Sequence, residues 1–370
     1  MKQILLSTLL ICAINFGWSQ DISQAKDLDL TSTLGEELAS IIISNTQNFP
    51  NNTQLSIAIV DGDETSFIGI IRESDQLQMI SNEEMVFEIG SISKVFGSIL
   101  LSKQVNDNKL SLDDTMFSHM GFKNDKASEG SKKITLKMLS NHTSGLPRIP
   151  LNMFPVMVQD QDNPYKNYTV ELLEDFYHSE VILDNEPGTT YAYSNLGAGT
   201  LGYILSKKAK MTFEELLQKE ILQPLGMNAS SSLMSKIDQE RLVKGRNANG
   251  EITSNWDFSD AMAALGAIKS SVTDMAKFMR HNMQNDPAYD LAHKSTYSVN
   301  ENLEVGLGWH ISKEGERSVF WHNGGTGGYK SCMAIDKKGK KGIIVLSNVS
   351  AFGGNAQQID GLCFQLLRNL

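Results

Sequence analysis

The sequence predicts an α+β protein built from two lobes. Short β-rich runs occur near the start of the 370-residue chain, mainly helical patterns fill its middle, and glycine-containing, β-branched runs return near its end. A chain of this length corresponds to two domains or one large domain. We therefore expect a sheet-and-helix lobe formed by residues 21–115 and 261–370, and a mainly helical lobe formed by residues 116–260. We expect the active site in the cleft between the lobes, where substrate sites are common.

Residues 1–20 have the features of a secretory signal peptide. Lys2 supplies a positive charge, residues 4–18 are mostly apolar, and small or polar residues follow at positions 19–21. The apolar run is too short to remain as a membrane span, although a buried N-terminal helix is the alternative. We therefore expect an exported protein, periplasmic or secreted, with no transmembrane span after the signal is removed.

The elements at the N-terminal end follow from local patterns. Apolar residues at helical spacing predict a first helix over residues 31–45. Two β-rich runs, 54–60 and 66–71, flank the turn-like Asp61-Gly62-Asp63 and predict a pair of strands. Helical periodicity then resumes over residues 91–106.

The remaining elements are assigned in the same way. Helical patterns cover residues 136–141, 170–178, 195–208, 213–222 and 274–281. Strand patterns cover 305–311, 319–321, 329–336 and 342–348, and a final helix covers 356–370. We expect the loops 148–166 and 244–260 to shape the cleft.

Composition and charge exclude several classes of protein. Hydrophobic residues make up 41% and charged residues 21% of the chain, which is typical of a globular protein and not of a disordered one. The formal charge is −10, and no basic run is interleaved with aromatic residues, so a nucleic-acid partner is not expected.

The motifs of α/β-hydrolases, NTPases, zincins and dinucleotide-binding proteins are missing from the sequence. There is no G-x-S-x-G, no G-x-x-x-x-G-K-[ST], no H-E-x-x-H and no G-x-G-x-x-G after a strand. Cys332 and Cys363 are the two cysteines that follow the predicted signal, and no C-x-x-C spacing suggests a metal site. We expect both cysteines to be small buried residues, and a single disulfide between them is the alternative. We expect no metal or cofactor.

The first candidate for catalysis is the pair Ser91 and Lys94. If a helix begins near Ser91, a lysine three residues later lies on the same face, and its amine can reach the serine hydroxyl. A lysine that is removed from water has a lowered pKa and can accept the serine proton. The alternative is a helix N-cap serine followed by a solvated lysine, and Ser23-Gln24-Ala25-Lys26 shows that the spacing also occurs elsewhere.

The second candidate is the pair Tyr193 and Asn195. In an extended segment these two side chains point the same way. A tyrosine beside cations can relay a proton, and an asparagine can hold a substrate amide through its donor and its acceptor. The alternative is a buried tyrosine followed by a helix-capping asparagine.

The third candidate is the glycine-rich segment 321–329, which begins Trp321-His322-Asn323-Gly324-Gly325. Glycines in a strand often mark the close approach of a ligand or of another backbone. His322 adds a group that titrates near neutral pH. The alternative is a bulge or turn with a structural histidine.

Together, Ser91-Ile92-Ser93-Lys94, Tyr193-Ser194-Asn195 and His322-Asn323-Gly324 resemble the three ordered motifs of the serine β-lactamase and penicillin-binding-protein superfamily. The resemblance is to the branch with class C β-lactamases, D-alanyl-D-alanine carboxypeptidases, D-aminopeptidases and esterases. It extends from about residue 31 to the C-terminus, with supporting stretches at 87–94, 141–147, 224–227 and 306–309. It implies an antiparallel sheet flanked by helices, with a mainly helical second lobe.

The resemblance also implies the roles of the site residues. Ser91 would be acylated, Lys94 would help to deprotonate it, and Tyr193 would move protons in acylation and deacylation. The backbone N–H groups of Ser91 and Gly325 would form the oxyanion hole. The substrate-binding residues that it implies are Asn195, His322, Asn323 and Gly324.

One position departs from the family pattern. Many members have a lysine where this chain has His322, and a histidine is charged only conditionally near neutral pH. Strong hydrolysis of penicillins or cephalosporins is therefore not implied.

The sequence thus predicts an exported serine hydrolase that cleaves an amide or ester through an acyl-enzyme on Ser91. We expect a β-lactamase-like or D-Ala-peptide-directed hydrolase, a small-molecule or short-peptide substrate and a monomer. The alternatives are a small-ester esterase or a D-aminopeptidase of the same fold, an inactive ligand-binding sensor, and a purely structural exported domain.

Overall fold

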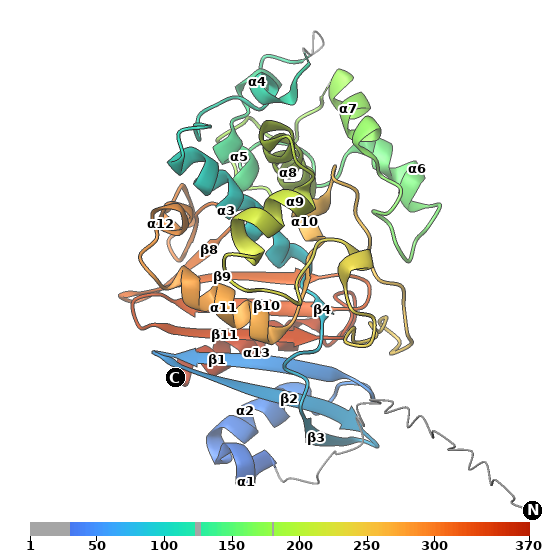
Figure 1. Ribbon diagram of the computed structural model, residues 1–370, viewed down its shortest axis with the longest axis vertical. Coiled ribbons are helices and arrows are strands. Elements are labelled where there is room, and N and C mark those ends of the chain that lie inside the picture. Colours follow the sequence, from blue (N-terminus) through green and yellow to red (C-terminus); the bar gives the residue numbers. More distant parts are fainter. Residues whose placement is uncertain (1–29, 123–126, 180) are drawn as a thin grey trace, which may run out of the picture.

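A nine-stranded antiparallel sheet forms the centre of the computed structural model, which describes residues 30–122, 127–179 and 181–370 (Figure 1). The strand order is β3-β2-β1-β11-β10-β9-β8-β7-β6. The bounds are β1 Gln54–Asp61, β2 Glu64–Glu73, β3 Gln76–Ile80, β6 Tyr297–Asn300, β7 Leu303–Val305, β8 His310–Glu314, β9 Arg317–Gly325, β10 Lys330–Asp336 and β11 Lys341–Ser347. A separate pair joins β4 (Phe87–Glu88) to β5 (Lys269–Ser270). The predicted signal peptide, residues 1–20, lies outside the described residues.

Strand alternation builds two cores, one on each face of the sheet. In β1, Leu55, Ile57 and Ile59 pack into one hydrophobic cluster, whereas Ala58 and Val60 pack into the other. The first cluster is completed by α2 (Glu36–Thr46) and α13 (Ala356–Arg368). The second is completed by α3 (Ser93–Asn106) and α11 (Val272–Asn282). The predicted fold class, an antiparallel sheet flanked by helices, is therefore confirmed.

Most of the remaining helices gather above the sheet in Figure 1. They are α4 Met116–Met120, α5 Leu136–Ser140, α6 Phe154–Met157, α7 Val170–His178, α8 Asn195–Ala209, α9 Phe213–Leu217, α10 Ala263–Gly266 and α12 Pro287–His293; α1 (Leu30–Leu34) precedes α2. Single helical turns lie at Gly90–Ile92, Ser131–Lys133, Leu151–Met153, Gln218–Leu222 and Met234–Lys236. Within the described ranges, no helix combines the length and hydropathy needed to cross a membrane.

Helix α8 is the buried centre of the helical region. The hydroxyl of Ser194 caps it by accepting a hydrogen bond from the N–H of Gly197 at 2.9 Å. At Gly202, a Cβ would lie 2.4 Å from the Cβ of Ala264 in α10, so only glycine allows this close packing. The cap and the packing fix the start of α8, where Tyr193 and Asn195 lie.

Some element boundaries differ from those predicted. The helix predicted over 31–45 is divided at Gly35, whose φ of +81° is outside the helical range. The strand predicted over 305–311 is interrupted, because the chain turns between β7 and β8 at Gly308, whose φ is +70°. Cys332 and Cys363 are both free and buried.

Candidate active site

A cavity of about 890 Å³ lies between the sheet and the helical region. Strand β9, the turn before α3, the start of α8 and the loops 148–166 and 244–260 all contribute to its lining, so both loops shape the cleft as expected. The predicted site residues that line it are Ser91, Tyr193, Asn195, Asn323, Gly324 and Gly325. Residues far apart in the sequence therefore meet in one cavity.

Ser91 lies in the single turn Gly90–Ile92, directly before α3, and Lys94 lies in the first turn of that helix. The Nζ atom of Lys94 is 3.0 Å from Ser91 Oγ and donates a hydrogen bond to the carbonyl of Leu265 at 2.7 Å. Lys94 is 3% exposed. Burial, with a smaller contribution from the charge of Arg148, lowers the pKa of this amine well below its usual range. A neutral amine beside a serine hydroxyl can act as a base.

The backbone of β9 approaches the backbone at Ser91 very closely. A Cβ at Gly90 would lie 2.4 Å from the nitrogen of Gly325, and φ at Gly90 is +51°. A Cβ at Gly324 would lie 2.9 Å from the nitrogen of Ser91. Glycine at both positions therefore brings the two predicted oxyanion-hole residues, Ser91 and Gly325, next to each other.

Two basic side chains, those of Lys94 and Arg148, lie near the ring of Tyr193. The Nζ atom of Lys94 is 5.0 Å from the centre of its ring, and the Cζ atom of Arg148 is 5.2 Å from the same point. Burial raises the pKa of the Tyr193 hydroxyl above its usual range, and an interaction with the Ser91 side chain offsets only part of that effect. The hydroxyl is therefore protonated near neutral pH and can donate its proton.

Two histidines lie close to Tyr193 in opposite tautomers. The ring centre of His142 is 4.3 Å from that of Tyr193, and the ring centre of His322 is 6.2 Å away. Nδ1 of His142 accepts the backbone N–H of Ser194, so the neutral ring carries its proton on Nε2. Nδ1 of His322 is 2.6 Å from the carbonyl of Asn323, which can only accept, so this ring carries its proton on Nδ1.

The environment of His322 differs from the one expected. The residue is 1% exposed, and it is not among the described residues that line the cavity. Burial lowers its pKa well below the usual histidine range, with further contributions from His310 and Lys94. His322 is therefore neutral at pH values where the sequence suggested a conditional charge.

Several side chains that the sequence patterns did not single out complete the cavity. Arg148 lines it beside Tyr193. Phe154, Val158 and Phe352 also line it, although they are 54%, 70% and 72% exposed, so its rim is apolar. Only the general expectation for the loop 148–166 pointed to any of them.

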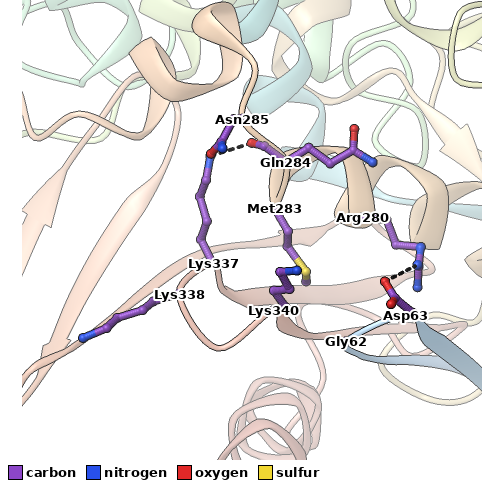
Figure 2. Close-up of a pocket in the computed structure, with 9 residues that line it drawn as sticks. All are labelled: Gly62, Asp63, Arg280, Met283, Gln284, Asn285, Lys337, Lys338 and Lys340. Atoms are coloured by element: carbon purple, nitrogen blue, oxygen red, sulfur yellow. Dashed lines mark hydrogen bonds and ion pairs between the residues drawn. The ribbon is translucent and has the colours of Figure 1, made fainter.

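A second cavity, of about 510 Å³, lies at the turns of the sheet and the end of α11, and Figure 2 shows its side chains. Lys337 donates to the carbonyl of Gln284 at 2.8 Å, and Arg280 lies 3.9 Å from the carboxylate of Asp63. No serine, cysteine, histidine or tyrosine is among the described residues that line it. Among the described residues of the whole chain, no cluster of three or more histidine, cysteine or carboxylate side chains could hold a metal ion.

Comparison with known proteins agrees with this geometry. A model of the beta-lactamase family matches residues 54–362. A beta-lactamase of Providencia stuartii is 26% identical over 253 residues, covering 68% of this chain and 59% of that protein. Protein flp of Staphylococcus aureus (strain NCTC 8325 / PS 47) is 23% identical over 275 residues, covering 72% and 53%. The chain thus spans less than two thirds of the length of these two relatives.

Solved structures share the fold. An octameric penicillin-binding protein homologue from Pyrococcus abyssi superposes with a TM-score of 0.74 at 24% identity, covering 89% of this chain and 76% of that one. A class C beta-lactamase mutant superposes with a TM-score of 0.73 at 20% identity, covering 90% and 97%. The large antiparallel sheet with flanking helices is the architecture that they have in common with this chain.

Proposed function

The chain belongs to the beta-lactamase family, and from this premise we propose that it is a serine hydrolase that cleaves an amide or ester through an acyl-enzyme on Ser91. The observation that carries the proposal is the 3.0 Å separation between Lys94 Nζ and Ser91 Oγ, with the lysine amine buried and its pKa lowered. A serine becomes nucleophilic when a base of this kind removes its proton.

The proposed reaction uses each neighbouring group once in acylation. Lys94 accepts the hydroxyl proton as Ser91 Oγ attacks the substrate carbonyl carbon. The N–H groups of Ser91 and Gly325 stabilise the negative oxygen that forms. The hydroxyl of Tyr193, whose raised pKa keeps it protonated, gives its proton to the leaving amine or alcohol. Water then attacks the acyl-enzyme: the Tyr193 oxygen, deprotonated in acylation, takes a proton from the water, and Lys94 returns its proton to Ser91 Oγ as the acyl group leaves.

Asn195 supports an acyl group that carries an amide. Its Nδ2 donates to the hydroxyl of Tyr165 at 3.1 Å, which fixes the orientation of the side chain. Its Oδ1 is buried and has no hydrogen-bond partner among the described residues. A substrate N–H would satisfy this acceptor, whose burial without a partner is unfavourable. We therefore favour D-Ala-peptide-like or β-lactam-like amides as the substrate class.

An esterase is the second candidate, and the apolar rim supports it. Phe154, Val158 and Phe352 expose large apolar surfaces at the entrance to the cavity. An apolar alcohol or acyl group would cover these surfaces and gain about 25 cal/mol for each Å² buried.

We also propose that the serine hydrolase is exported through residues 1–20 and acts as a monomer.

Covalent labelling with a serine-directed fluorophosphonate, followed by peptide mass analysis, tests the function. We expect the adduct on Ser91 and none on the Ser91→Ala variant. The matched control is Ser93→Ala, because the Ser93 hydroxyl is buried and accepts the N–H of Ile268 at 3.1 Å. Turnover of one β-lactam, one D-Ala-D-Ala peptide, one D-amino-acid amide and one short-chain ester would identify the leaving group. Ligand binding with neither adduct nor turnover would favour the sensor instead.

A further inference from the structure

Backbone hydrogen bonds to the start of α8 hold Arg148 at the cavity. Its carbonyl accepts hydrogen bonds from the N–H groups of Asn195 at 2.9 Å and Leu196 at 3.1 Å. These are the first two residues of α8, and only the capping residue Ser194 separates them from Tyr193. These hydrogen bonds fix the backbone of Arg148 beside the site residues Tyr193 and Asn195, opposite strand β9.

The guanidinium of Arg148 faces the cavity without a carboxylate partner. It lines the cavity, with Cζ 5.2 Å from the centre of the Tyr193 ring, and it makes no ion pair with another described residue. No aspartate or glutamate is among the described residues that line the cavity. This is notable in a chain whose formal charge is −10.

The other basic groups at or beside the cavity have lowered pKa values or are paired with an acid. The pKa of Lys94 is lowered well below its usual range, and burial lowers the pKa of His310 to about 4. Lys330, which also lines the cavity, forms an ion pair with Asp360 at 2.9 Å. Arg148 is therefore the uncompensated positive charge among the described lining residues.

From this arrangement we propose that the enzyme prefers substrates with a carboxylate on the acyl group, and that Arg148 binds this carboxylate. The proposal rests on the serine hydrolase function above. Arg148 lies next to Asn195, which is proposed to accept the acyl-group amide, so the carboxylate belongs to the acyl side and not to the leaving group. A guanidinium can bind a carboxylate through two parallel hydrogen bonds. The buried, neutral His322 is not required for this contact.

Matched aryl esters test the assignment. The first is p-nitrophenyl para-carboxybenzoate, with an anionic acyl group, and the second is p-nitrophenyl para-methylbenzoate, which is neutral and of similar shape. The third is para-carboxyphenyl benzoate, with the carboxylate on the leaving group. We expect kcat/KM of the first ester to fall about tenfold in Arg148→Gln, as one charge-assisted contact predicts. The other two esters should change less than about threefold, and Arg148→Lys should recover part of the loss.

The control variant is Arg280→Gln, which removes an arginine at the remote second cavity and should leave all three esters unchanged. An equal loss for all three esters in Arg148→Gln, with a shifted pH profile, would overturn the proposal. Arg148 would then be a residue that positions Lys94 and Tyr193 or sets their pKa values. A loss confined to para-carboxyphenyl benzoate would overturn the assignment to the acyl side.

A binding measurement separates this proposal from the hydrolase function. In the Ser91→Ala protein, we expect para-carboxybenzamide to bind about tenfold more tightly than para-methylbenzamide, and Arg148→Gln to remove the difference. This result would support the role of Arg148 even if no ester were hydrolysed. Equal dissociation constants for the two amides would overturn that role even if Ser91 were labelled.

Discussion

The carboxylate of Asp360 accepts a hydrogen bond from the side-chain amide of Asn323 at 2.8 Å. The same oxygen forms the ion pair with Lys330, so one residue of α13 both positions a residue of the glycine-rich strand and neutralises a cation of the cavity. The other carboxylate oxygen is buried without a partner among the described residues.

The Asp360→Asn variant should therefore gain affinity for anions. Its amide oxygen can still accept from Asn323, but Lys330 loses its counter-charge and becomes a second uncompensated cation. We expect the dissociation constant of para-carboxybenzamide, measured in the Ser91→Ala background, to fall by about threefold or more, and the free energy of unfolding to fall by roughly 1–3 kcal/mol. An unchanged dissociation constant would show that Lys330 does not act on the cavity.

Lys94→Met should abolish acylation while leaving the helix intact. Methionine has a similar shape and helix propensity, but it cannot accept the proton of Ser91. We expect the rate of fluorophosphonate labelling to fall by about three orders of magnitude or more, since groups that act as one unit do not replace each other. Labelling at the wild-type rate would eliminate Lys94 as the base.

The same variant tests the lowered pKa of Lys94 through stability. Between the lowered pKa in the folded protein and the ordinary value near 10.5, the unfolded chain binds a proton that the folded protein does not. The free energy of unfolding of the wild type therefore rises with pH in this window, by at most about 1.4 kcal/mol per pH unit from this group. Lys94→Met lacks this group, so the wild-type-minus-variant difference should rise with pH. Urea titrations at several pH values measure it, and a flat difference would mean an ordinary pKa.

Substrate-charge preference should not depend on pH near neutrality. Arg148 keeps its charge, and the pKa of His322 is lowered well below the usual histidine value. We expect the ratio of kcat/KM for the anionic and neutral acyl esters to stay constant between about pH 5.5 and about pH 7.5. A fall in this ratio around the ordinary histidine pKa that disappears in His322→Gln would instead show that His322 reads substrate charge.

His142→Asn should slow turnover with little change in fold. His142 has φ of +62°, a region that asparagine tolerates, and the new side-chain oxygen can still accept the N–H of Ser194. The variant lacks the Nε2–H donor beside Tyr193. We therefore expect kcat to fall about tenfold and the alkaline side of the kcat–pH profile to shift. An unchanged pH profile with a lower melting temperature would indicate a structural role alone.

The central strands could be predicted because their signal is local. Ile57 and Ile59 face one core while Ala58 and Val60 face the other, so residues 57–60 of β1 form an uninterrupted apolar run. Strand β3 (Gln76–Ile80) was missed because it is a short, partly exposed edge strand, too short for its alternation of polar and apolar residues to stand out. Strand β6 (Tyr297–Asn300), the other edge, was missed for the same reason.

The site also has features that the local sequence indicates and features that it does not. Ser91 and Lys94 are related by about one helical turn, so their spacing allowed the contact, and the resemblance of all three motifs to the family favoured it. Arg148 meets Tyr193 only because separate loops pack together, and nothing near Arg148 in the sequence indicates this. Burial lowers the pKa of His322, and His310 and Lys94, which come from two other segments, lower it further. Local spacing could identify the residue, but it could not give the residue's charge.

The strand order has a consequence for how the chain folds. Ile57 pairs with Val345, and β11 lies between β1 and β10 in the sheet. Strands β1 and β2 can form a hairpin early in folding, but this hairpin cannot join the rest of the sheet until β11 is available to pair with β1. Such long-range pairing makes folding slow and exposes apolar strands in the interval. A chain that ends before β11 should therefore aggregate or be degraded, even though Ser91, Lys94, Tyr193 and His322 have all been synthesised by then.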